Sequence, residues 1–379
     1  MATLIADADG NILPLSGHSA SYLKKQAMWA AIGLLLMIVF SRLSYSRLQK
    51  AAVWLLLAAL ALLIPLAVMG ALRWLRAHHV PVPCPRISLF PYVNGSYRWI
   101  RLGPASLQLS IQPSEFAKLA LTVFTAAFLA KRASRIAEFG RCLLPSMVIV
   151  GAAAGMVFME PDFGAAAVIA AIVFSIWYVA GVRGRYLWTM VILGAPTFIW
   201  LMLAEKYRRM RWLAFLDPEK YLLQGGWQPF QSLVALGSGG WQGLGLGQSR
   251  QKYQFLGEPH TDFIFAIVGE ETGLIGTLGL IVLYAILITV GLIIARQTFQ
   301  YDFFGALAAY GLTAMIAIPT IINLAVVTSS MPTKGLALPF LSYGGSSMIA
   351  NCIAVGILMN IASQNHAQKI GRASCSERV

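Results

Sequence analysis

Residues 258–271 read EPHTDFIFAIVGEE, and within them a polar segment enters an apolar run that continues to residue 295. Pro259 precedes the run, and Asp262 stands at its start. About 20 consecutive apolar residues are enough to cross the hydrocarbon core of a bilayer as a helix. The stretch therefore predicts a membrane helix with a carboxylate at its entrance. Because 262–295 is longer than one crossing needs, we expect this helix to tilt or to project from the membrane.

The composition extends this prediction to the whole chain. Of its 379 residues, 58% are hydrophobic and only 12% are charged, whereas soluble domains carry about 25% charged residues. Further apolar runs of membrane-crossing length lie at 27–41, 51–72, 114–130, 143–159, 163–181, 186–204, 303–328 and 339–362. The sequence therefore predicts an all-α polytopic membrane protein with about nine transmembrane helices.

The segments between the runs predict the orientation and the domain organisation. Arginine and lysine crowd three tight connections that alternate correctly to share the cytoplasmic face: 41–50, 131–141 and 182–185. We expect residues 1–363 to form one membrane domain whose large outer loops are 73–113, 205–261 and 329–338. Residues 364–379 are expected to form a cytoplasmic tail. Its last nine residues look unlike the rest of the chain, and we interpret them as a cloning or sequencing scar that carries no structural information.

The outer loops are also basic, and the net charge of the chain is +14. The usual excess of arginine and lysine on the cytoplasmic side does not account for cations outside, such as Arg98 and Lys334. A negatively charged ligand is one explanation, and contact with anionic lipid headgroups is the other. The charge pattern alone leaves both open.

Polar residues next to the membrane runs are further candidates. Lys118 lies in the first turns of a predicted span, where an ionisable side chain is a functional candidate, although snorkelling to the interface is the alternative. Glu160 and Asp162 belong to the EPDFG turn at 160–164, and we interpret both acids as part of a hydrated hairpin.

Other classes of site lack support in the pattern. The four cysteines show no paired spacing, so we expect neither a disulfide framework nor a thiolate metal site. The glycine-rich part of loop 205–261 is followed by no Walker pattern and preceded by no predicted strand, which excludes a nucleotide site. Its amphipathic character predicts an interfacial or re-entrant element.

Several long motifs resemble one known family, and they occur in its order between Tyr22 and Ser363. They are IQPSEFAKLAL, EPDFG, QSLVALGSGGWQGLGLGQSRQKY, HTDFIFAIVGEE and PTKGLALPFLSYGGSS. Together they resemble the SEDS family (shape, elongation, division and sporulation), and the GLGQSRQKY and PTKG variants are closest to its cell-division branch. The chain departs from the pattern at Gly257, where proline is usual, and at Gln254, where some members have glutamate.

The resemblance implies a ten-helix bundle, of which this chain is expected to lack the first helix. It implies a peptidoglycan glycosyltransferase that polymerises lipid II on the outer face of the bacterial cytoplasmic membrane during cell division. The implied partners are lipid II, the growing glycan strand, a class B penicillin-binding protein transpeptidase and other divisome proteins, with no nucleic acid. A flippase for lipid II, or a scaffold without catalysis, are the alternative hypotheses.

The resemblance also assigns the site. Asp262 corresponds to the essential acid, which would serve as general base for the acceptor hydroxyl; the alternative is an acid favoured only by the helix dipole. Arg98, Lys118 and Lys334 are expected to bind the leaving pyrophosphate. The supporting candidates are Glu115, Gln254, Glu258 and Ser342. A divalent cation, Mg²⁺ or Mn²⁺, with Asp262 or Glu258 as ligand, is left open.

Overall fold

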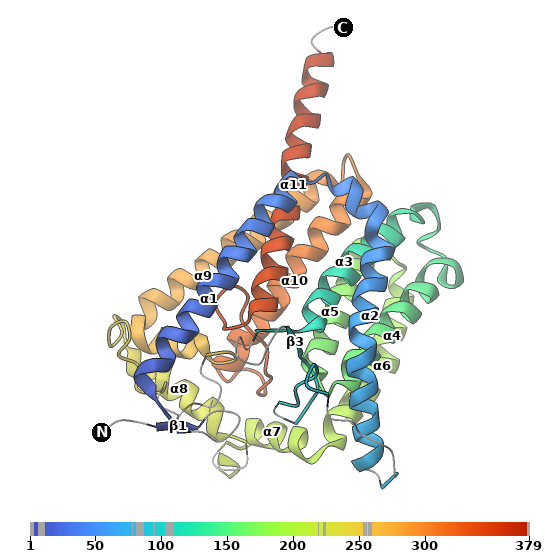
Figure 1. Ribbon diagram of the computed structural model, residues 1–379. Helices are drawn as coiled ribbons and strands as arrows, with labels where there is room; N and C mark the ends of the chain where they lie inside the picture. Colours follow the sequence, from blue (N-terminus) through green and yellow to red (C-terminus); the bar gives the residue numbers. More distant parts are fainter. Residues whose placement is uncertain are drawn as a thin grey trace.

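The computed structural model describes residues 4–6, 12–77, 79–80, 87–93, 95–102, 109–218, 220–222, 225–252, 256 and 260–376 (Figure 1). Within this part, the chain is a helical bundle with two short β-hairpins. The hairpins are antiparallel and pair β1 (Leu4–Ala6) with β2 (Ile12–Pro14) and β3 (Ile100–Leu102) with β4 (Leu109–Ile111). The fold is therefore all-α in its membrane part, as predicted.

Long helices occupy every predicted span of the described chain. They are α1 (Leu15–Arg42), α2 (Tyr45–Ala77), α3 (Pro113–Ala130), α4 (Leu144–Met159), α5 (Phe163–Val179), α6 (Gly184–Ala204), α9 (Ile264–Thr298), α10 (Phe303–Val327) and α11 (Gly345–Ser376). Among the described residues, seven helices are long and apolar enough to cross a membrane by length and composition, and α5 is a shorter apolar helix. A 3₁₀ turn (Ala133–Arg135) and a π-helical turn (Phe139–Leu143) precede α4.

Two shorter helices belong to the large outer loop. They are α7 (Lys206–Leu216) and α8 (Trp227–Gly239), and they lie across one end of the bundle. The C-terminal turns of α11 project from the opposite end (Figure 1). The predicted outer loops therefore gather at a single end of the molecule.

Small residues let the central helices approach closely. A Cβ atom at Gly311 of α10 would lie 2.6 Å from Cγ2 of Thr122 on α3 and 2.7 Å from Cδ1 of Ile176 on α5. Glycine and alanine at such contacts permit close approach of membrane helices, whose association depends on packing because lipid is itself apolar. The core consequently forms around α3, α5 and α10.

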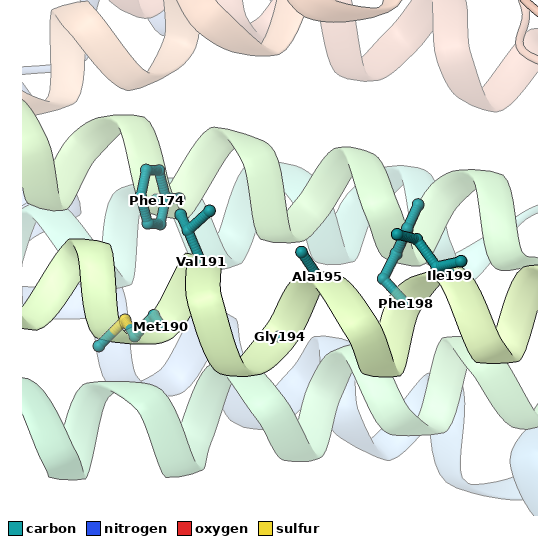
Figure 2. A pocket seen from close by; sticks show the side chains of 7 residues that line it. All are labelled: Phe174, Met190, Val191, Gly194, Ala195, Phe198 and Ile199. Carbon is teal, nitrogen blue, oxygen red and sulfur yellow. The ribbon is translucent and has the colours of Figure 1, made fainter.

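Helix α6 lies at the edge of this core, and most of its side chains are exposed. An open apolar groove runs between α5 and α6 (Figure 2). Its lining residues are Phe174, Met190, Val191, Gly194, Ala195, Phe198 and Ile199. The groove is open to the outside of the bundle.

The long run after Asp262 is bent, not straight. Gly273 has φ 67° and ψ −165° inside α9, a conformation that is essentially restricted to glycine. The amide nitrogens of Leu274 and Ile275 donate to the carbonyl oxygens of Gly240 (2.9 Å) and Trp241 (3.2 Å). The run therefore forms two helical parts that meet at Gly273, where the glycine-rich segment after α8 contacts the bend. That the run tilts or projects from the membrane stays a prediction.

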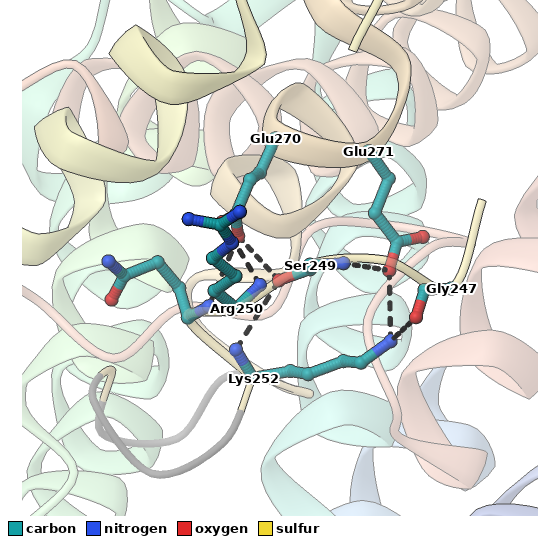
Figure 3. Close-up of polar contacts among 7 residues, drawn as sticks. Gly247, Ser249, Arg250, Lys252, Glu270 and Glu271 are labelled. Carbon is teal, nitrogen blue, oxygen red and sulfur yellow. Dashed lines mark hydrogen bonds and ion pairs between the residues drawn. The ribbon is translucent and has the colours of Figure 1, made fainter. Parts of the chain in front are cut away.

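Two acids of α9 hold this glycine-rich segment (Figure 3). The carboxylate of Glu270 accepts from the backbone nitrogens of Arg250 (3.0 Å) and Gln251 (3.2 Å) and from the Ser249 hydroxyl. The carboxylate of Glu271 accepts from the Ser249 backbone nitrogen and from the Lys252 ammonium, both at 3.3 Å. Through these contacts Glu270 and Glu271 hold residues 249–252 against α9.

Candidate active site at one end of the bundle

Asp262 is half-buried at the entrance of α9, and its backbone is fixed by α10. The side-chain nitrogen of Asn323 donates to the carbonyl oxygens of Asp262 (2.8 Å) and Leu336 (2.7 Å). Asn323 is buried. A single amide therefore joins the Asp262 segment to loop 328–344, which connects α10 with α11. Asn323 was not predicted from the sequence, because a lone asparagine in an apolar run does not reveal its partners.

Ser342 makes a second link between the same two segments. Its hydroxyl donates to the carbonyl oxygen of Thr261 and accepts from the backbone nitrogen of Leu338 at 2.7 Å. Next to it, the backbone nitrogen of Tyr343 donates to the carbonyl oxygen of His260 at 2.8 Å. The predicted supporting residue Ser342 thus lies beside the Asp262 segment, where it positions backbone.

The carboxylate of Asp262 rests against the backbone of Gly335. A Cβ atom at position 335 would lie 2.6 Å from Oδ2 and 3.6 Å from Oδ1 of Asp262. Contacts under 3.0 Å are essentially never seen for a Cβ atom. The absence of a side chain at Gly335 therefore makes the space that this carboxylate occupies.

Lys334 immediately precedes that glycine and sits among aromatic rings. Its Nζ atom lies 5.2 Å from the ring centre of Phe163 and 5.3 Å from that of Phe198. Such positions favour a cation through the ring quadrupole, whereas burial lowers the pKa of Lys334 below its ordinary value. Phe198 also lines the groove between α5 and α6. The cation therefore lies where the apolar groove meets the acid's loop.

Lys118 and Glu115 neutralise each other inside α3. The Lys118 Nζ atom lies 2.8 Å from Glu115 Oε1, and both residues are buried. A buried ion pair of this kind persists only when its geometry is good, because both charges have left water. The structure thus pairs two of the predicted site residues. That Lys118 binds pyrophosphate stays a prediction.

Arg98 contacts the turn between α4 and α5. Its guanidinium donates to the carbonyl oxygen of Glu160 (3.4 Å) and to that of Pro161. In this arrangement Arg98 closes the hairpin on its outer side. That Arg98 binds the leaving pyrophosphate stays a prediction.

The two acids of this turn are buried, so the interpretation as a hydrated hairpin is wrong. Asp162 caps α5, since Oδ1 accepts from the Ala165 nitrogen (3.1 Å) and Oδ2 from Gln112 Nε2 (3.2 Å). Glu160 is 0% exposed. Burial, with the Asp162 charge adding and Arg98 opposing, raises the pKa of Glu160 to about 9. The hairpin is enclosed because other segments pack over it, which a local pattern does not reveal.

Glu160 makes stability depend on pH. Its pKa rises from an ordinary 4.5 to about 9 in the folded protein, so between these values only the unfolded chain has released the proton. Stability therefore falls as pH rises through this window and levels off above it. We expect the stability advantage of Glu160→Gln over the wild type to grow from pH 5 to pH 8, by up to about 1.4 kcal/mol per pH unit. Thermal unfolding in detergent at both pH values measures it.

An exposed acid provides the control for this experiment. Glu138 has an exposed side chain, paired at 3.4 Å with Arg141 on the surface. Glu138→Gln should shift the unfolding temperature equally at pH 5 and pH 8. If Glu160→Gln behaved in the same way, Glu160 would be ionised in the folded protein, and the argument from burial would be wrong.

Two of the predicted site residues, and the metal that the sequence left open, have no position in the described part of the chain. Gln254 and Glu258 lie outside the described residues. Among the described residues, no group of three or more histidine, cysteine, aspartate or glutamate side chains could hold a metal ion.

The fold and the site define a class of protein. It is a polytopic membrane protein whose acid, Asp262, and half-buried cation, Lys334, meet at one end of the helix bundle beside an apolar groove. Residues 10–367 match the model of the FtsW/RodA/SpoVE cell cycle protein family. The chain therefore belongs to this family, and the SEDS resemblance is confirmed.

Curated relatives are similar over most of the chain. The probable peptidoglycan glycosyltransferase FtsW of Legionella pneumophila is 36% identical over 351 residues, which cover 92% of this chain and 84% of that protein. The protein of the same name from Coxiella burnetii is 41% identical over 271 residues, 71% of this chain and 72% of that protein.

Solved structures are similar in fold. A chain described in work on the structural coordination of polymerization and crosslinking by a peptidoglycan synthase complex is 30% identical, with a TM-score of 0.70 over 91% of this chain and 90% of that one. The rod shape determining protein RodA of Thermus thermophilus is 26% identical, with a TM-score of 0.63 over 91% of this chain and 88% of its own. The predicted SEDS-type helical bundle is thereby confirmed.

Proposed function

We propose that this chain is a peptidoglycan glycosyltransferase that polymerises lipid II into glycan strands during cell division. The names of its curated relatives support the activity. The observation that carries the proposal is the placement of Asp262 against Gly335, next to the half-buried Lys334.

Glycosyl transfer from a lipid diphosphate requires a carboxylate and cations in one site. The acceptor hydroxyl must lose a proton as it attacks, and Asp262 is the general base that takes it. The sugar carbon passes through an oxocarbenium-like state, and the departing diphosphate carries negative charge. Lys334 stabilises that charge, since an ammonium binds phosphate oxygens as a compact point charge. Arg98 and Lys118 are proposed to add to this field.

A divalent cation is a further proposal. Mg²⁺ commonly binds through one or two carboxylates together with substrate phosphates and water. Asp262 would supply the carboxylate, and the substrate's diphosphate would supply further oxygens. Such an ion, Mg²⁺ or Mn²⁺, would neutralise charge that develops on the leaving diphosphate.

The proposed function also implies a localisation and a set of partners. The chain is a multi-pass membrane protein, and we place it in the bacterial cytoplasmic membrane with the site outside. The basic connections at the end opposite the site support this orientation. A class B penicillin-binding protein is the proposed partner, because a similar chain has been described in a peptidoglycan synthase complex. Lipid II, the glycan strand and other divisome proteins complete the proposed set.

Reconstitution in vesicles tests the function. Purified protein with its transpeptidase partner receives labelled lipid II, and gel electrophoresis measures glycan strands while a leaflet-specific assay measures translocation. We expect polymer that depends on the protein. Translocation of lipid II without polymer would instead indicate a flippase and would refute the proposal.

A further inference from the structure

Helix α7 is tied to the loop that carries Lys334. The Arg211 guanidinium donates to the carbonyl oxygen of Thr333 at 3.1 Å. This bond fixes the position of α7 relative to the residue that directly precedes Lys334. The basic segment 206–212, KYRRMRW, is thereby placed at the site.

Arg208 of α7 shares an aromatic ring with Lys334. The Arg208 guanidinium carbon lies 5.4 Å from the ring centre of Phe163 and 5.9 Å from that of Phe158. Lys334 Nζ lies 5.2 Å from the same Phe163 ring centre. Because both distances end at one ring centre, the two charged atoms lie no more than about 11 Å apart. A diphosphate with a hydrogen bond at each end can span such a separation.

Neither cation forms an ion pair in the described part of the chain. Both are half-buried, and the ion pairs found there join Lys118 to Glu115, Arg141 to Glu138 and Lys252 to Glu271. Two like charges beside one ring repel each other in surroundings that screen them less than water does. The arrangement therefore favours a bound anion.

We propose that Arg208 is a second cation of the site, and that Arg208 and Lys334 together bind the two phosphates of a prenyl diphosphate. The inference rests on the proposed function, in which the leaving group is a lipid diphosphate. Arginine suits this role because its planar guanidinium binds phosphate oxygens in a bidentate manner. The alternative is that Arg208 only packs α7 against Phe158 and Phe163.

Comparing a diphosphate with a monophosphate distinguishes a role of Arg208 in binding from a role in packing alone. The protein is placed in nanodiscs of zwitterionic phosphatidylcholine, and calorimetry measures binding of geranylgeranyl diphosphate and geranylgeranyl monophosphate. Arg208→Gln should weaken diphosphate binding on the order of tenfold or more and change monophosphate binding much less. The preference for the diphosphate should therefore collapse. Arg208→Lys, which keeps the charge, should retain part of it.

The neighbouring arginine is the matched control. Arg209 is exposed on the same helix, so Arg209→Gln should bind both probes as the wild type does. If Arg208→Gln also did so, the proposal would be overturned. Arg208→Met keeps an apolar stem against the ring without the charge. If the glutamine variant is unstable, the methionine variant takes its place and should show the same loss of preference for the diphosphate.

Two further experiments test whether lipid headgroups supply the anion and whether a negative result contradicts this inference or the proposed function. Nanodiscs containing phosphatidylglycerol should leave the Arg208 dependence intact; loss of that dependence would show general headgroup binding and contradict the proposal. An Arg208-dependent diphosphate preference in a protein that does not polymerise lipid II would refute the proposed function alone. Polymerisation with unchanged probe binding in Arg208→Gln would refute this inference alone.

Discussion

Replacing Asp262 by asparagine should abolish glycan strand formation while the protein stays folded. Asparagine has nearly the same shape but cannot accept the proton of the acceptor hydroxyl, and general-base catalysis contributes about 10²- to 10⁴-fold. The contact from Asn323 uses the backbone carbonyl of residue 262 and does not need the carboxylate. The measurement is strand formation from purified lipid II, with the partner present and with equal amounts of folded protein.

An exposed aspartate of the same outer loop serves as control. Asp217 ends α7, and its Oδ1 accepts only a local bond from the Lys220 backbone nitrogen among the contacts of the described chain, at 3.3 Å. Asp217→Asn should retain wild-type turnover. Full turnover by Asp262→Asn would remove Asp262 from catalysis, and tolerance of that variant in cells would support a non-catalytic scaffold.

The second large effect is expected at Gly335, which has no reactive group. In Gly335→Ala the new Cβ atom would come within 2.6 Å of Asp262 Oδ2, so the carboxylate must turn or shift. Misplacement of a catalytic group by about 1 Å can lower turnover by about 10²-fold. We expect a loss of that order in kcat, with a much smaller change in the unfolding temperature, because the displaced atom is the end of a half-buried side chain.

Gly344, further along the same loop, provides the comparison. The nearest atom to a Cβ at position 344 would be Ser347 Cβ at 3.8 Å, an ordinary contact. Gly344→Ala should therefore keep nearly full activity. Should Gly335→Ala turn over lipid II like Gly344→Ala, the carboxylate would not need the position that it occupies against Gly335.

The apolar runs predicted the helices well because crossing a bilayer is a local requirement. Every backbone polar group in hydrocarbon must be satisfied within its own helix, so length and hydropathy alone located the nine long helices of the described chain, of which seven are long and apolar enough to cross a membrane. The position of Asp262 at a helix entrance was predictable for the same reason. The resemblance to the SEDS family added its role and that of Lys334.

Partners across the bundle could not be predicted from local pattern. The Arg211 guanidinium donates to the carbonyl oxygen of Thr333, which lies 122 residues later in the chain. The bend at Gly273 contacts residues 240 and 241, which lie more than 30 residues earlier in the chain, and the spacing of residues within α9 does not reveal that contact.

By itself the sequence determined a multi-span membrane helix bundle with an acid at one entrance, because hydropathy acts along a single helix. Only the tertiary structure decided which charges meet. It set Gly335 against Asp262, enclosed Glu160, and separated Arg208 beside Phe163 from the exposed Arg209. The physical reason is that burial and charge pairing depend on which loop ends pack together, and the spacing of residues within one segment does not contain that information.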